Sequence, residues 1–412
     1  MQFCAFFIFA RVLGSEGQGL LSIFRSLGQI IASIIWIGIP SSVVYFLGRD
    51  KNNLEPFLRN CLKWILVIFP FVLITILFFP LDGIEKYTSL KPYVKYLPFF
   101  ILFASFFDLF QGVMLGLKKY LYYNLFTFCL GLLVFLGALI VGFIDSGSYM
   151  VELSILVYIM SFAVMSFGGG VVTFSAIKMR DRIKTNLNFI TQLIVGIRGF
   201  ISGIASLLLF RLDLILVSYF LSFKEAGIYS IAVFSAEMIT KIPYWSAAVL
   251  TPIVASNEEG NVKKTIYLFY SSIILALVLA AAFILIIKLL PDIISNIIGK
   301  DFSGVEICML LLLPRVIMQS GIGILAANLA GKGYPWYHPL GTLLAVLLLI
   351  ILDILLIPMF GVKGASIANS LAYIGAAIVF WLGFVKYNKP SKLYIHEYCN
   401  YIHSHLNRCR LL

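Results

Sequence analysis

The chain has 412 residues, of which 61% are hydrophobic and only 12% charged, and its formal net charge is +12. Soluble domains are about half apolar and a quarter charged, so this composition indicates an integral membrane protein and excludes an independent soluble domain of ordinary size. The basic residues cluster in loops beside hydrophobic segments, which favours a positive-inside arrangement in a membrane over binding to nucleic acid.

The six cysteines include no Cys-x-x-Cys pair, and several lie inside hydrophobic segments. This pattern indicates neither a disulfide framework nor a zinc site, and we predict no metal and no cofactor. In the C-terminal segment His396, Cys399 and His403 fall at helical spacing, an arrangement that could bind metal but that arises easily in a His-rich tail.

Twelve hydrophobic segments approach the length of about 20 apolar residues that a spanning helix needs. They lie near residues 1–10, 20–46, 60–79, 97–117, 122–144, 151–177, 189–221, 228–253, 266–290, 304–329, 339–358 and 365–385. The first is only half a span, so we expect that the start of this helix is missing. We therefore predict an all-α integral membrane protein with about 12 transmembrane helices, the first one truncated.

The distribution of Lys and Arg predicts the orientation. Loops assigned to the cytoplasm hold 18 of these residues and the opposite loops hold 8, which places both termini inside. Six spans precede the basic linker at 178–184, so the first and seventh spans enter from the same side and the halves form parallel repeats. We predict an N-terminal lobe over 1–183, a C-terminal lobe over 184–385, and an amphipathic cytoplasmic tail over 386–412.

A short internal repeat supports this duplication. The segment Leu13–Ile23 aligns with Leu221–Ile231 at an offset of 208 residues, about half of the chain. Gly19 then corresponds to Gly227, and several neighbouring positions also match.

Five basic residues lie within the predicted spans, where an ionised side chain costs at least about 2.5–3.5 kcal/mol: Arg25, Arg198, Arg211, Lys241 and Arg315. Gln29 follows Arg25 by four residues and Gln319 follows Arg315 by four, so each guanidinium shares a helix face with an amide. Such faces suit phosphate and sugar hydroxyls. Packing between helices, or extension of the side chain to the interface, explains any one of them equally well.

Two pairs of charges concern the seventh and eighth spans. Glu237 and Lys241 are four residues apart with the acid first, so we expect them to neutralise each other. Arg211 and Asp213 lie about 200° apart around a helix and cannot pair directly. Each therefore needs a partner on another span, or water.

The remaining acids of the spans are Asp108, which is deep, and Asp353, which precedes Pro358 by five residues and is expected near the outer interface. Pro314, beside Arg315, interrupts the tenth span, and breaks of this kind commonly line a cavity. The candidate ion-coupling residues are Asp108, Asp213, Glu237 and Lys241.

Three stretches carry a family resemblance: residues 10–50, beginning ARVLGSEGQG; RLDLILVSYFLSFKEAGIYSIA at 211–232; and FGVKGASIANSLAYIG at 360–375. They resemble the flippases of polysaccharide biosynthesis, the O-antigen and exopolysaccharide branch of the multidrug/oligosaccharidyl-lipid/polysaccharide transporter superfamily. The resemblance covers nearly all of the chain, in order.

The resemblance implies two six-helix lobes around a central cationic cavity, alternating access, and a substrate of sugars on an undecaprenyl diphosphate carrier. We assign the substrate-binding role to Arg25, Gln29, Arg198, Arg211, Arg315 and Gln319. The implied setting is the prokaryotic cytoplasmic membrane, and the implied partners are the lipid bilayer and the glycan polymerase and glycosyltransferases of the same pathway, with no nucleic acid.

Two other function classes remain open. A multidrug cation antiporter of the same superfamily would need unpaired acids to hold a cation, whereas basic residues slightly outnumber acids in the spans. A membrane glycan polymerase or ligase would share the hydropathy and the lipid partner. It would normally carry a large outer loop for chemistry, and the largest here covers only about residues 80–96, so we predict a transporter and not an enzyme.

Overall fold

The computed structural model describes residues 1–36, 39, 42–43, 46–47, 54–78, 89–144, 149–178, 189–256, 261–289, 297–331 and 335–388. Within these ranges the secondary structure is helical, and they contain no strand. Nine of the helices in these ranges have the length and apolar character needed to cross a bilayer. The tail predicted over 386–412 lies, from residue 389 onward, outside this part of the chain.

The helices before the basic linker are α1 Gln2–Trp36, α3 Leu54–Phe78, α4 Lys91–Val94, α5 Leu97–Gly116, α6 Tyr120–Phe143 and α7 Met150–Lys178. Those after it are α8 Phe189–Phe220, α9 Phe223–Ser256, α10 Asn261–Leu289, η5 Lys300–Phe302, α12 Val305–Leu311, α13 Leu313–Gly331, α14 Tyr337–Phe360 and α15 Val362–Asn388. The predicted spans correspond to the two arms of α1, to α3, α5–α10, α14 and α15, and to α12 with α13.

Helix α1 contains the first two predicted spans, joined by a kink at Gly14. This residue has φ 67° and ψ −178°, a conformation that glycine adopts without the steric cost of a Cβ atom. The first arm of α1 contacts α6 along its length: Gln2 lies against Gly131 of α6, and Val12 lies near Gly142. The first arm therefore runs along α6 toward the end where Gly14 turns the chain back.

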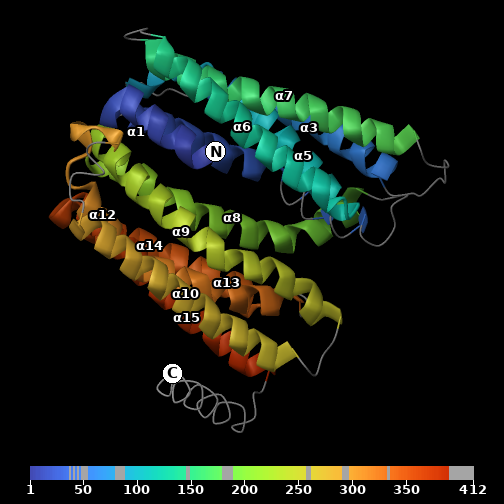
Figure 1. Ribbon diagram of the computed structural model, residues 1–412. Coiled ribbons are helices and arrows are strands. Elements are labelled where there is room, and N and C mark those ends of the chain that lie inside the picture. Colours follow the sequence, from blue (N-terminus) through green and yellow to red (C-terminus); the bar gives the residue numbers. More distant parts are fainter. Residues whose placement is uncertain are drawn as a thin grey trace.

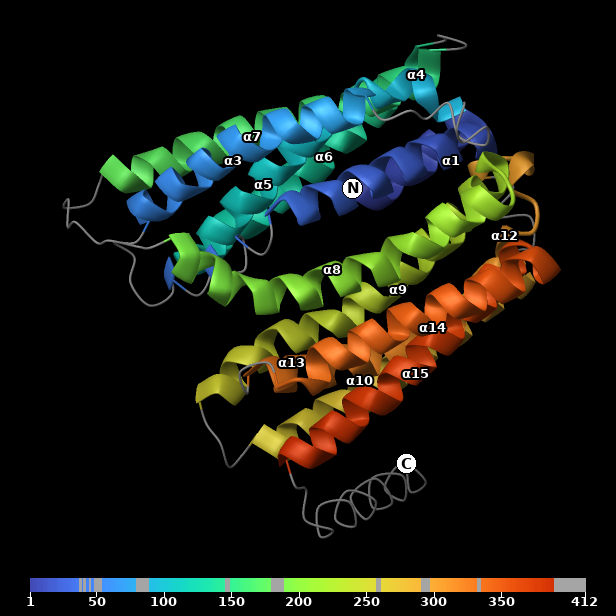
Figure 2. The same cartoon turned by 180° about the vertical axis from the view of Figure 1, so that it is seen from behind.

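Helices from the two parts of the sequence form two groups in space (Figures 1 and 2). Helices α3, α5, α6 and α7 lie on one side, α8–α15 lie on the other, and α1 lies between them. Helix α1 contacts α5, α6 and α7 of its own half and α8 and α9 of the other half. The predicted boundary at residue 183 is outside the described residues.

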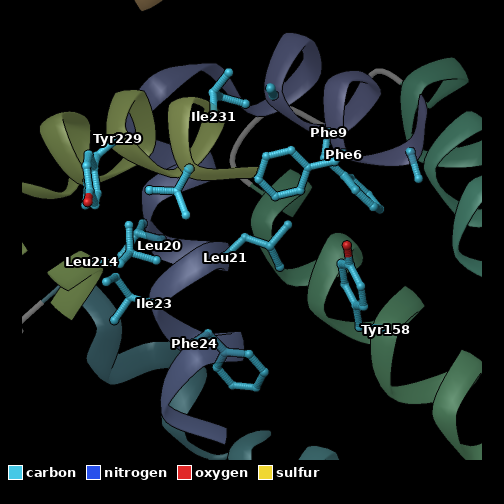
Figure 3. Packing of buried hydrophobic residues seen from close by; sticks show 14 of the residues in the cluster. Phe6, Phe9, Leu20, Leu21, Ile23, Phe24, Tyr158, Leu214, Tyr229 and Ile231 are labelled. Atoms are coloured by element: carbon cyan, nitrogen blue, oxygen red, sulfur yellow. The ribbon is translucent and has the colours of Figure 1, made fainter. Parts of the chain in front are cut away.

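The largest apolar cluster joins the two halves around α1. Figure 3 shows Leu20 and Ile23 of α1 close to Leu214 of α8, while Leu21 and Phe24 point toward the side of Tyr158. The rings of Phe6 in α1 and Phe234 in α9 stack with centroids 4.0 Å apart. Since helices in a bilayer associate through van der Waals packing, these contacts make α1 an apolar link between the halves.

The duplicated segments meet face to face. A Cβ atom added to Gly19 would lie 1.9 Å from the carbonyl oxygen of Phe223, and one added to Gly227 would lie 1.8 Å from the carbonyl oxygen of Ser15. Ser15 and Phe223 are themselves related by the repeat offset of 208. This reciprocal contact is what a twofold relation between the halves produces, and it leaves no room for a side chain at either glycine.

Candidate anion site between α1, α8, α9 and α13

A pocket at the junction of the halves contains two of the predicted arginines. About 450 Å³ of space, counted to its open mouth, lies between side chains of α1, α8 and α9. The lining residues are Phe6, Ser22, Arg25, Ser26, Gln29, Phe210, Arg211, Leu214, Ser230, Val233 and Phe234. Arg25 and Gln29 thus line one site, as their spacing on α1 predicts.

Arg211 connects three helices at this pocket. Its Nε donates to Oε1 of Gln29 in α1 at 3.3 Å, and its Nη1 donates to Oε1 of Glu237 in α9 at 3.3 Å. The Arg211 side chain remains 26% exposed, whereas that of Glu237 is 12% exposed. The predicted need of Arg211 for partners on other spans is confirmed, and its guanidinium remains accessible from the pocket.

Arg315 approaches the same carboxylate from α13. Its side chain is fully buried, its Nη2 lies 3.9 Å from Oε1 of Glu237, and its Nε donates to Oε1 of Gln319 at 3.4 Å. The rings of Phe210 and Tyr373 flank the guanidinium carbon at 5.6 Å and 5.0 Å. Neither terminal nitrogen has a hydrogen-bond partner within the described ranges. Buried donors without acceptors are costly, so this guanidinium is suited to an incoming anion.

Arg25 completes the group of cations. Its guanidinium carbon lies 4.1 Å from the ring centroid of Tyr158 in α7, and its Nε has no hydrogen-bond partner in the part of the chain that the structure describes. It lies within electrostatic range of both Arg211 and Glu237. Three guanidiniums therefore lie around Glu237, and Arg315 also interacts with the charge of Asp213. Three cations and two acids leave a net positive charge at the junction of the halves.

A second polar cluster lies within the C-terminal half. The Asp213 carboxylate is fully buried and accepts three hydrogen bonds. The donors are the Leu214 N–H at 2.7 Å, the Tyr229 hydroxyl at 2.5 Å and the Asn369 amide at 2.5 Å. Asp213 and Arg211, two residues apart on α8, thus point to different partners, as the helix geometry predicts.

The side chain of Asp353 lies inside the protein. Its position near the outer interface stays a prediction, and α14 ends two residues after Pro358, at Phe360. Asp353 is fully buried, lies close enough to Asp213 for their charges to interact, and has no hydrogen-bond partner on either oxygen among the described residues. A buried carboxyl group in this state is protonated or holds a cation, since an isolated buried charge is prohibitively costly.

The other predicted residues lie outside the pocket. Lys241 is exposed, and Glu237, its expected partner, instead forms ion pairs with Arg211 and Arg315. Asp108 is exposed on α5 and does not line the pocket. The side chain of Arg198 is outside the described part of α8.

Sequence patterns did not single out several residues that complete these two clusters. Tyr158, Phe210 and Tyr373 flank guanidiniums, while Tyr229 and Asn369 bind Asp213. Their types are common in membrane spans, so no charge or spacing marks them. Asn369 was detectable only as an amide inside the FGVKGASIANS stretch.

Comparisons with known proteins agree with this architecture. The family model of polysaccharide biosynthesis proteins matches residues 1–258. A probable low-salt glycan biosynthesis flippase of Haloferax volcanii, Agl15, is 24% identical over 164 residues, which cover 39% of this chain but only 35% of that protein.

Two solved structures show the fold. An inward-facing multidrug resistance transporter of the MATE family, in the MOP superfamily, superposes with a TM-score of 0.73 at 16% identity, over 95% of this chain and 96% of the other. The lipid II flippase MurJ, in an inward closed conformation, gives a TM-score of 0.62 at 16% identity, over 95% and 91% of the two chains. The chain has the membrane transporter fold that these proteins share.

Proposed function

Because this chain belongs to the polysaccharide biosynthesis protein family, we propose that it is a flippase for oligosaccharides linked to undecaprenyl diphosphate. It moves this lipid from the inner to the outer leaflet by alternating access. The observation that carries the proposal is the group of three guanidiniums around Glu237 at the junction of the halves, which stays net positive with Asp213 counted. A lipid-linked diphosphate needs such compensating charge wherever it leaves water.

In this mechanism Arg25, Arg211 and Arg315 bind the diphosphate. A guanidinium presents a planar fork of donors that matches phosphate oxygens, and Arg315 and Arg25 both carry donors that no described residue accepts. Gln29 and Gln319 each accept a hydrogen bond from one of these guanidiniums. Gln29 also lines the pocket, where its amide can bind sugar hydroxyls. Arg198 of α8 is assigned to the same role from its position in the sequence.

Movement of the substrate follows from the location of the site. The halves meet through α1 of the first half and α9 of the second. One arginine of the site is on α1, and the other two are on α8 and α13 of the second half. Rocking of one half against the other therefore changes the access to the pocket. The sugars cross through the hydrated space between the halves, while the lipid tail remains in the bilayer. The 18 to 8 distribution of basic residues supports an orientation with both termini in the cytoplasm.

The buried acids supply a site for a coupling ion. Asp213 and Asp353 share one region of the C-terminal half, and Asp353 has free acceptor oxygens there among the described residues. A proton or a monovalent cation at this pair would neutralise one of the two charges. Because Asp213 lies two residues after Arg211 on α8, binding of the ion also acts on the helix that carries the anion site. Asp108, Glu237 and Lys241 are the weaker candidates for this role.

A multidrug cation antiporter is the alternative that the shared fold leaves open. The pocket argues against it, because cations outnumber acids there and Glu237 is already paired with two arginines. The relatives described above are flippases or transporters, which supports transport over a glycan polymerase or ligase.

Complementation tests the proposal. The gene should restore surface glycan in a strain that lacks its own flippase, and lipid-linked oligosaccharide should accumulate at the inner leaflet without it. A drug antiporter would instead raise resistance to cationic dyes and leave the glycan unchanged. Dye resistance that depends on Asp108 or Asp213, with normal glycan in the deletion strain of the native host, would overturn the proposal.

A further inference from the structure

The carboxylate of Glu237 occupies the place where an anion would bind. Its Oε1 atom lies 3.3 Å from Nη1 of Arg211 and 3.9 Å from Nη2 of Arg315, and Arg25 is within electrostatic range. Arg211 is on α8 and Arg315 is on α13, so Glu237, on α9, bridges them from a third helix. One side-chain oxygen thus substitutes for the oxygens of a phosphate.

We propose that Glu237 is a movable counter-ion, which fills the anion position while the site is empty and is displaced toward Lys241 when a diphosphate binds. This inference rests on the proposed function, because it requires an anionic substrate. It assigns Glu237 a role in the exchange of the substrate rather than in static packing.

The geometry favours displacement. The contact with Arg315, at 3.9 Å, is longer than a hydrogen bond, and both terminal nitrogens of Arg315 lack a hydrogen-bond partner among the described residues. A diphosphate has more acceptor oxygens and more negative charge than one carboxylate, so it can serve donors that Glu237 leaves idle. Two anions close together in a site of low dielectric repel each other strongly, and the carboxylate must therefore leave.

Lys241 provides the position to which the carboxylate moves. It lies one helical turn beyond Glu237 on α9, its side chain is exposed, and it is within electrostatic range of Glu237. Residues four apart on a helix are neighbours, and the order of acid before lysine is the favourable one. Rotation of the Glu237 side chain therefore exchanges one ion pair for another, while Gln29 still holds Arg211 through its Nε.

This exchange has a function in release. Without the carboxylate of Glu237, the three guanidiniums would bind the diphosphate tightly and release it slowly. Return of the Glu237 carboxylate to Arg211 and Arg315 competes with the bound diphosphate and weakens the binding of the diphosphate. Glu237 thus lowers the affinity of the site in order to permit turnover.

Binding of farnesyl diphosphate to the purified full chain in nanodiscs, measured by titration calorimetry, tests the inference. Glu237→Gln should bind about tenfold more tightly than the wild type, because a competing and repelling charge is removed. Lys241→Gln should bind several-fold more weakly, since the displaced carboxylate loses its partner. In the double variant the effect of Lys241→Gln should vanish, because no carboxylate remains to be received. Glu225→Gln, at the start of the same helix, is the matched control and should bind as the wild type does.

The outcomes separate the two proposals. A wild type that binds no diphosphate contradicts the proposed function itself. A wild type that binds, together with a Glu237→Gln variant of equal or lower affinity, overturns the movable counter-ion. A loss from Lys241→Gln that persists in the double variant also overturns it, because Lys241 would then bind the diphosphate directly. If Glu237→Gln does not fold, Lys241→Gln decides alone, and an unchanged affinity overturns the inference.

Discussion

Replacement of Gly19 by alanine should separate the two halves of the molecule where the duplicated segments cross. The new Cβ atom would lie 1.9 Å from the carbonyl oxygen of Phe223, and real Cβ contacts essentially never fall below 3.0 Å, so the helices must move apart by at least 1.1 Å. The obstacle is backbone, which cannot rotate away as a side chain can. Overpacking of this kind costs about 1–3 kcal/mol. That cost would shift a conformational equilibrium by roughly 5- to 150-fold away from the state in which these helices touch.

The reciprocal contact sharpens this prediction. Gly227→Ala should act in the same way, because its Cβ would lie 1.8 Å from the carbonyl oxygen of Ser15. The same separation relieves both clashes, so the double variant should cost little more than either single variant, a clear departure from additivity.

Distances between spin labels provide the assay. Cysteines at the exposed positions Glu16 and Lys224, which line one pocket at this end of the molecule, carry the labels. The distance between them should lengthen in Gly19→Ala. Gly203→Ala is the matched control, because no atom of the described residues, apart from its chain neighbours and its own helix backbone, lies within 4 Å of its added Cβ. Equal distances and equal thermal stability in Gly19→Ala and Gly203→Ala would refute the reasoning.

Three further predictions concern topology, the buried acids and the arginines. A cysteine at Ser222 should react with a membrane-impermeant reagent from outside and one at Lys264 only after permeabilisation, and the reverse labelling would invert the orientation. Asp353→Asn should unfold at the same temperature as the wild type or higher, because it removes a buried carboxyl group that has no hydrogen-bond partner among the described residues. The same variant should lose coupled transport in a vesicle uptake assay. Retained transport would exclude Asp353 from coupling. Arg211→Gln and Arg198→Gln should abolish complementation while immunoblots show normal amounts in the membrane, and their disappearance from the membrane would make these residues structural.

Composition predicts the membrane-spanning helices of this molecule, and the spacing of residues predicts which side chains share one face of a helix. Long apolar runs force the backbone to satisfy its hydrogen bonds within helices, so the spans are visible from hydropathy. Spacing by four residues correctly placed Gln29 in the pocket with Arg25, and Gln319 against Arg315. The break that Pro314 predicted lies at Leu312, although this residue keeps helical dihedral angles and the interruption is slight.

Contacts between helices were not predictable in the same way. The sequence places Lys241 beside Glu237 on α9. The ion-pair partners of Glu237 are instead Arg211 of α8 and Arg315 of α13, and the spacing of residues along α9 cannot predict contacts with other helices. Gly19 and Gly227 were found as a repeat, and only the structure shows that the two copies touch.

Flipping of a lipid-linked oligosaccharide in proteoliposomes tests the anion site most directly. The wild type should move a labelled undecaprenyl-diphosphate oligosaccharide between leaflets. Arg211→Gln and Arg315→Gln should each reduce the rate by about tenfold or more, since a hydrogen bond to a charged group contributes about 1.5–3 kcal/mol. Arg59→Gln, an exposed arginine of α3 outside the pocket, should flip at the rate of the wild type. Wild-type rates in the Arg211 and Arg315 variants, or vesicles that take up cationic dyes and flip no lipid, would contradict a cationic site for the diphosphate.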